Sequence, residues 1–89
     1  MNASGMRYLT VDPIQPSAVI PWLTRSDGQS GALISFFGIV RADQEGDRTV
    51  EALLYEAYES MAELELADLI ALAMSRWPIS NVVVRHRLG

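Results

Sequence analysis

The stretch Gly31–Arg41, read GALISFFGIVR, is the part of the chain from which the fold is predicted. Residues 32–40 are aliphatic, aromatic or small, carry no charge before Arg41 and are interrupted once, by Gly38. This pattern predicts a strand buried on both faces. A glycine near the end of such a strand indicates a bulge or a close approach of backbone or ligand. At the strand exit, the Arg41 guanidinium is suited to bind a carboxylate or phosphate, but the first solvated residue after a core strand fits the same pattern.

Three further segments predict strands around this one. Alternating side chains over Met6–Val11 and Thr49–Tyr58 are typical of half-buried strands. A last buried strand is predicted to begin at Asn81–Val84 and to continue through Arg85-His86-Arg87. An acidic loop containing Gly46 separates the central strand from Thr49–Tyr58. Because this loop is short, the two strands are expected to lie antiparallel and side by side.

Two helices are predicted between the strands. One covers Pro16–Thr24, and the other covers Met61–Trp77, where apolar residues recur at helical spacing. Ser60 and Glu63 match a capping box at the start of the second helix. Two helices are too few to cover both faces of a parallel sheet, so the pattern favours one α+β domain over residues 1–89 with a mostly antiparallel sheet.

Composition excludes several classes of function. The 89 residues carry a net charge of −4 and contain no cysteine. No basic run is suited to nucleic acid, no apolar run is long enough to span a bilayer, and no secretory signal precedes residue 6. We therefore expect a cytoplasmic protein that binds neither nucleic acid nor membrane, and the residue spacing predicts no metal site.

The chain contains no lysine, which limits its chemistry further. A tunable side-chain amine, whether as base, acid or covalent nucleophile, is absent from the printed sequence. All seven basic residues are arginines, at Arg7, Arg25, Arg41, Arg48, Arg76, Arg85 and Arg87.

Other titratable residues have simpler structural interpretations. His86 is the only histidine and lies between Arg85 and Arg87, whose charges disfavour both protonation and metal binding, so we interpret it as structural or interfacial. The glutamates between residues 51 and 65 point in different directions on a strand and a helix, so no general acid and base pair is supported.

An ordered series of short motifs resembles the large, catalytic subunit of molybdopterin synthase. The resemblance runs from about Met6 to Gly89 in one register. The matching residues are Pro21-Trp22-Leu23, Gly31-Ala32, Phe36-x-Gly38-x-Val40-Arg41, Glu45-Gly46, Leu54-x-Glu56-x-Tyr58, Met61-Ala62-Glu63, Arg76-Trp77-Pro78 and His86-Arg87-Leu88-Gly89.

This resemblance implies an α/β-hammerhead fold, a homodimer, no cofactor and a small ubiquitin-like sulfur-carrier partner. The partner's C-terminal Gly-Gly tail carries a thiocarboxylate, from which sulfur passes to a cyclic pyranopterin monophosphate in molybdenum cofactor biosynthesis. Arg41 matches the family's active-site arginine, so the resemblance implies that it is catalytic and holds an anionic group of the pterin precursor or the tail. Phe36 and Gly38 are expected to shape the adjacent wall of the substrate site.

The sequence also departs from the family pattern. Ala42-Asp43 stand where an asparagine usually follows the arginine. The family chain continues beyond the position of Gly89 with a lysine-rich catalytic segment, so the fold is expected to be incomplete at its C-terminus. We therefore predict that the 89-residue chain alone is not a competent sulfurtransferase. The alternative is a short, catalytically inactive paralogue that acts as a binding or scaffold subunit.

Overall fold

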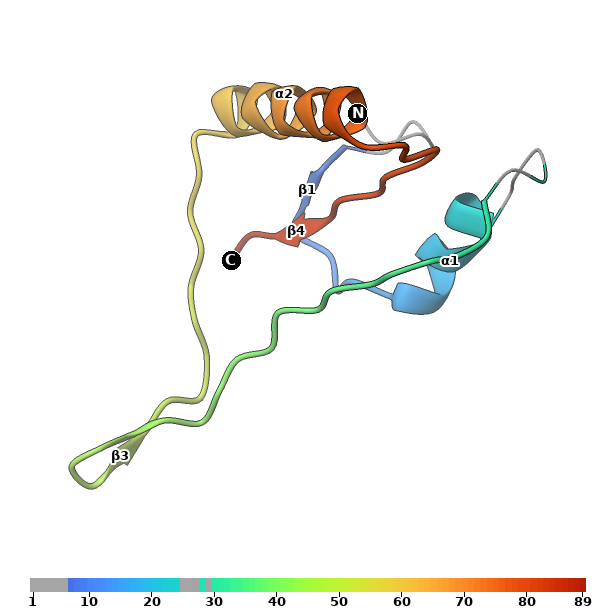
Figure 1. Cartoon of the computed structure of the whole chain (residues 1–89). Helices are drawn as coiled ribbons and strands as arrows, with labels where there is room; N and C mark the ends of the chain where they lie inside the picture. The colour runs from blue at the N-terminus through green and yellow to red at the C-terminus, as the bar shows by residue number, and fades with distance from the viewer. Residues whose placement is uncertain (1–6, 25–27, 29) are drawn as a thin grey trace.

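The computed structural model describes residues 7–24, 28 and 30–89. A long helix, α2, lies across a short parallel pair of strands, β1 and β4, and two extended segments reach away from this body to a hairpin (Figure 1). In chain order the elements are β1 (Leu9–Thr10), α1 (Pro16–Thr24), β2 (Gln44–Glu45), β3 (Arg48–Thr49), α2 (Glu59–Arg76) and β4 (His86–Arg87).

The small core lies where β1 meets β4 and α2. Leu9 is in register with His86 and Thr10 with Arg87. Among the described residues, Tyr8 and Leu9 are the buried hydrophobic side chains, with 3% and 7% of their surface exposed. The core therefore depends on a contact between the two ends of the described chain.

Helix α2 forms because its sequence contains no glycine or proline and is rich in alanine, leucine and glutamate. Glu59 in the first turn and Arg76 in the last turn interact favourably with the helix dipole, which is positive at the N-terminus and negative at the C-terminus. The predicted capping box is wrong: Tyr58 occupies the N-cap position, and no side chain caps the helix. The Glu63 carboxylate instead accepts hydrogen bonds from the amides of Tyr8 and Leu9, so it ties β1 to α2.

Strands β2 and β3 form an antiparallel hairpin with Gln44 opposite Thr49 and Glu45 opposite Arg48. Gly46 opens the two-residue turn with φ of +67°, a conformation that glycine adopts without strain. We call residues 30–43, which lead into this hairpin, the incoming arm, and residues 50–58, which lead out of it to α2, the outgoing arm. The two arms diverge beyond the hairpin (Figure 1).

The prediction of a central strand buried on both faces is wrong. Residues 31–41 are exposed and contain no strand, and Ile34 and Phe36 each have 92% of their surface exposed. A strand is buried only where a neighbouring strand and a packed layer contact it, and the incoming arm has neither. The radius of gyration is 15.7 Å, compared with about 12 Å for a compact domain of this length. The chain is therefore open in this conformation.

The α+β class with two helices is confirmed. Helix α1 has the predicted bounds, and α2 begins and ends within two residues of its prediction. The predicted strand Met6–Val11 is reduced to β1, and its first residue lies outside the described part of the chain. Strand Thr49–Tyr58 is reduced to its start in β3, and the last predicted strand is reduced to its end in β4. Neither helix in the described ranges has the length and apolar character to span a bilayer.

Candidate functional site

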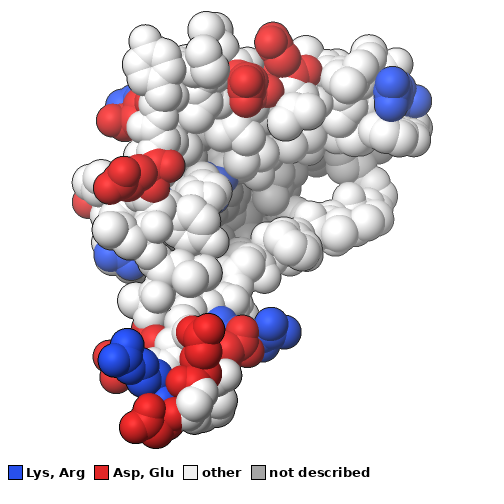
Figure 2. All heavy atoms as spheres, turned by 90° about the vertical axis from the view of Figure 1, so that its left-hand side faces the viewer, with Lys and Arg blue, Asp and Glu red and all other residues white. Residues whose placement is uncertain are grey.

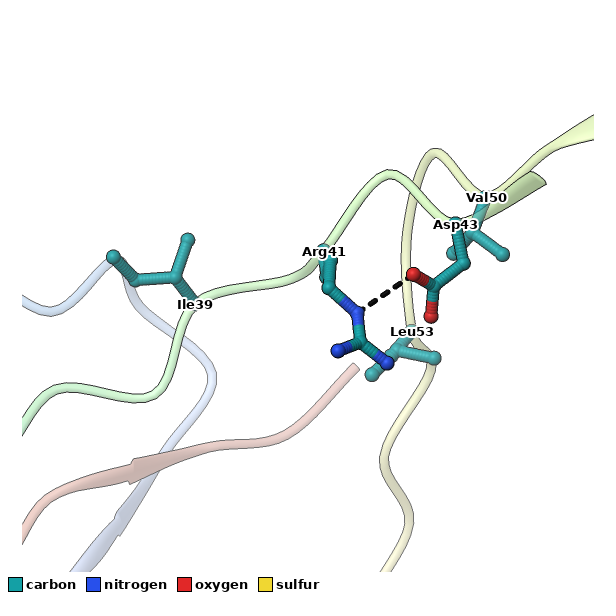
Figure 3. Close-up of a pocket in the computed structure, with 5 residues that line it drawn as sticks. All are labelled: Ile39, Arg41, Asp43, Val50 and Leu53. Atoms are coloured by element: carbon teal, nitrogen blue, oxygen red, sulfur yellow. Dashed lines mark ion pairs between the residues drawn. The ribbon is translucent and has the colours of Figure 1, made fainter.

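A hollow of about 400 Å³ lies where the two arms leave the hairpin, and Arg41 lines it. Ile39 and Asp43 contribute from the incoming arm, while Val50 and Leu53 contribute from the outgoing arm (Figure 3). The arms are held together here by a hydrogen bond of 2.8 Å from the Val50 amide to the Asp43 carbonyl. The hollow thus combines apolar side chains with one guanidinium and one carboxylate.

The Arg41 guanidinium forms an ion pair with Asp43. Its Nε atom lies 2.6 Å from Oδ1 of Asp43. Residues two apart on an extended backbone point to the same side, and a hydrogen bond from the Asp43 amide to the Arg41 carbonyl tightens the chain between them. The side chains are 85% and 52% exposed, so this pair stabilises the chain by no more than about 1 kcal/mol. Asp43 is therefore a weak internal partner of Arg41.

The structure does not bring the predicted site residues together in one hollow. Phe36 and Gly38 lie on the incoming arm but do not line the hollow at Arg41. Phe36 projects into solvent, and a Cβ atom added to Gly38 would meet nothing within 4 Å. Asp43 is the site residue that sequence reasoning missed. The Arg-x-Asp spacing is the signal that identifies it, since an extended chain places both side chains on one side.

A second hollow, of about 280 Å³, lies under α2. Tyr55 of the outgoing arm and His86 of β4 line it together with apolar side chains of α2, including Leu66. The Tyr55 and His86 rings meet edge to face with their centroids 4.9 Å apart. This contact agrees with a structural role for His86.

Charged side chains of both signs gather at the hairpin end of the molecule (Figure 2). They belong to the hairpin and its flanks, which carry Arg41, Asp43, Glu45, Asp47 and Arg48. No cluster of three or more histidine, cysteine, aspartate or glutamate side chains suited to a metal ion occurs in the described ranges. The hairpin end therefore carries charges of both signs rather than a patch of one sign.

Together, the fold and the hollow define a small α+β chain in which an exposed arginine, paired with an aspartate, lines a partly apolar hollow. Comparison with known proteins identifies its family: residues 9–89 match the family described as MoaE protein, and the chain belongs to that family.

Curated relatives carry the name "Molybdopterin synthase catalytic subunit". The Thermoplasma volcanium protein is 43% identical over 81 residues, which are 91% of this chain and 57% of the relative. The Salmonella typhimurium protein is 46% identical over 68 residues, covering 76% of this chain and 44% of the relative. The Escherichia coli protein is 40% identical over 77 residues, covering 86% and 50% respectively. The chain thus spans about half the length of these relatives, and no solved structure matches it.

Proposed function

We propose that this chain acts, as a single domain, in molybdenum cofactor biosynthesis as the large-subunit component of a molybdopterin synthase. In the intact family this activity is sulfur transfer from a thiocarboxylated small partner to a cyclic pyranopterin monophosphate. The observation that carries the proposal is the match of residues 9–89 to the family, supported by relatives named as catalytic subunits at 40–46% identity. Neither the fold nor the comparisons favour the alternative of an inactive paralogue.

Arg41 is the residue we assign to the anionic group of the pterin precursor or of the partner's tail. Its exposed guanidinium lines the hollow between the arms, and among the described residues Asp43 is its only ion-pair partner. A bidentate bond from guanidinium to a phosphate or carboxylate is stronger than a pair that uses Nε alone, so such a ligand has an advantage over Asp43.

Calorimetric titration with cyclic pyranopterin monophosphate tests this assignment. Arg41→Ala should weaken binding by roughly tenfold or more, because a charge-assisted hydrogen bond contributes about 1.5–3 kcal/mol. Arg48→Ala is the matched control, since Arg48 is an exposed arginine on the same hairpin but does not line the hollow. Equal weakening by both substitutions would show a general charge effect and would refute the role of Arg41.

Asp43 should oppose this binding. Asp43→Ala removes the internal partner of Arg41 and one negative charge beside the hollow, so it should strengthen binding of the same monophosphate by a few-fold. Unchanged affinity would indicate that the pair does not compete with the ligand.

The whole reaction is expected to need more than these residues. With no lysine in the sequence, the 89-residue chain mixed with thiocarboxylated partner and pterin precursor should show no sulfur transfer above a blank. A homodimer, a small ubiquitin-like partner and a cytoplasmic location remain part of the proposal. Sedimentation of the chain alone and with its partner tests the two assemblies.

A further inference from the structure

Two arginines share one face of the chain at β4, on the side that points away from α2. His86 and Leu88 line the hollow under α2. Because side chains alternate along an extended strand, Arg85 and Arg87 point to the opposite face. Neither arginine lines the hollow under α2 or the hollow between the arms. The two cations therefore belong to neither hollow.

The main chain next to β1 holds both guanidinium groups in place. Nη1 of Arg85 donates to the carbonyl of Arg7, and Nε of Arg87 donates to the carbonyl of Val11 at 3.4 Å. Each guanidinium uses one nitrogen in these bonds, so its other nitrogens are available as donors. Arg87 is exposed and Arg85 is half-buried. Because the side chains are already anchored, each loses less conformational entropy when it binds a ligand.

The two guanidinium groups lie at the edge of β1 that does not face β4. The carbonyls of Tyr8 and Thr10 accept the hydrogen bonds from the β4 side. Main-chain groups of successive strand residues point to alternate edges, so the carbonyls of residues 7 and 11 point to the outer edge. The Leu9 amide points to the same edge and donates to the Glu63 carboxylate. These three main-chain groups are thus bonded to side chains, and an incoming segment meets guanidinium groups rather than a free strand edge.

Neither Arg85 nor Arg87 has an ion pair within residues 7–24, 28 and 30–89. The ion pairs in those ranges involve Arg7 and Arg41 instead. Two cations that are held in place without an internal acid are suited to an external anion. The net charge of −4 disfavours nucleic acid as that anion, because the polyphosphate chain repels an acidic protein. The carboxylates of an acidic protein segment are the remaining ligand of sufficient length.

We propose that Arg85 and Arg87 bind an extended acidic segment of a partner protein, which runs along the outer edge of β1 with one carboxylate at each guanidinium. The two anchoring carbonyls belong to residues 7 and 11, which are at most about 13 Å apart on an extended strand. An extended segment repeats this spacing between side chains four positions apart, which lie on the same side. A single phosphate or carboxylate is too short to reach both guanidinium groups. This binding site lies beyond the proposed function, because it uses neither Arg41 nor the pterin precursor.

Two synthetic peptides of identical composition test the spacing. Both consist of threonine and valine with two glutamates, which lie four positions apart in the first peptide and three positions apart in the second. On an extended chain the second peptide carries its glutamates on opposite sides and reaches one arginine at a time. The first peptide should bind up to about fivefold more tightly, because it forms a second exposed ion pair. Titration of the chain at low salt, followed by the amide resonances of β1 and β4, measures both affinities.

Substitutions assign the contact to the two arginines. Arg87→Gln and Arg85→Gln should each abolish the preference for the first peptide. Arg48→Gln is the matched control, because it removes the same charge from an exposed arginine of β3 and should leave the preference unchanged. Circular dichroism of α2 checks that each variant is folded. If Arg85→Gln unfolds, Arg87→Gln alone decides the test, because it removes only the bond of 3.4 Å to Val11.

Equal affinity for the two peptides, or no binding of either, would overturn the proposal. An equal loss of preference in Arg48→Gln would also overturn it, because general charge attraction would then explain the binding. Inorganic phosphate is the probe for a small-anion site. If phosphate shifts the same resonances at a lower concentration than the first peptide, the ligand is a small anion and the proposed acidic segment is wrong.

Discussion

The Glu63 carboxylate is the contact on which the small core depends most. Oε2 accepts a hydrogen bond of 3.1 Å from the Tyr8 amide, and Oε1 accepts one of 3.0 Å from the Leu9 amide. Nε of Arg7 lies 3.2 Å from Oε1, and the Glu63 side chain is 18% exposed. One carboxylate thus accepts hydrogen bonds from the Leu9 amide in β1 and from the amide of Tyr8, the residue before β1. Strand β1 in turn pairs with β4.

Glu63→Gln should lower the free energy of unfolding by about 2 kcal/mol, because a hydrogen bond to a charged group contributes about 1.5–3 kcal/mol. The glutamine keeps one acceptor oxygen but turns an amide donor toward the second backbone amide, so one bond is lost. The half-exposed pair with Arg7 adds little. Urea unfolding at pH 7, followed by the circular dichroism of α2, measures the difference.

Glu65→Gln is the matched control, because it makes the same chemical change on an exposed residue of the same helix. It should change the free energy of unfolding by no more than about 0.5 kcal/mol. A Glu63→Gln chain as stable as the Glu65→Gln chain would refute the reasoning.

The pH dependence provides a second check. Burial acts to raise the pKa of Glu63, but the hydrogen bonds from Leu9 and Tyr8 and the charge of Arg7 outweigh it, so the pKa is lowered. A carboxyl with a lowered pKa in the folded state contributes stability above its unfolded pKa, about 4.3. That contribution is lost as the pH falls through the lower folded pKa. The gap between wild type and Glu63→Gln should therefore be constant from pH 7 to about 5 and shrink below about 4.3.

Three further substitutions test separate contacts by urea unfolding. Gly46→Ala should destabilise the hairpin by about 1–2 kcal/mol, because alanine is strained at the positive φ of this turn. An unchanged free energy of unfolding would mean that residue 46 does not adopt this positive φ. Arg41→Ala should change stability by less than about 1 kcal/mol, because its pair with Asp43 is exposed; a larger loss would mean that Arg41 has a structural role. Asn81→Ala removes a hydrogen bond of 2.8 Å to the Trp22 carbonyl and should cost about 1 kcal/mol, whereas an unchanged midpoint would show that this contact does not help hold α1.

Helices were the predictable part of the fold because their signals are local. The composition of Glu59–Arg76 and the absence of glycine and proline within it suffice to predict α2. The same local signals predicted a wrong role for Glu63, as part of a capping box. A glutamate three residues after a serine matches a capping box, but its actual partners lie 54 and 55 residues earlier in the chain.

Strand pairings were less predictable because they depend on contacts between distant residues. Nothing in the local sequence around Leu9 identifies His86 as its partner in a parallel pair. The apolar run at residues 32–40 has the composition of a buried strand, but composition cannot supply the neighbour that buries it. At the candidate site the role of Arg41 stays a prediction from the sequence, and its ion pair with Asp43 is a contact that the Arg-x-Asp spacing indicates.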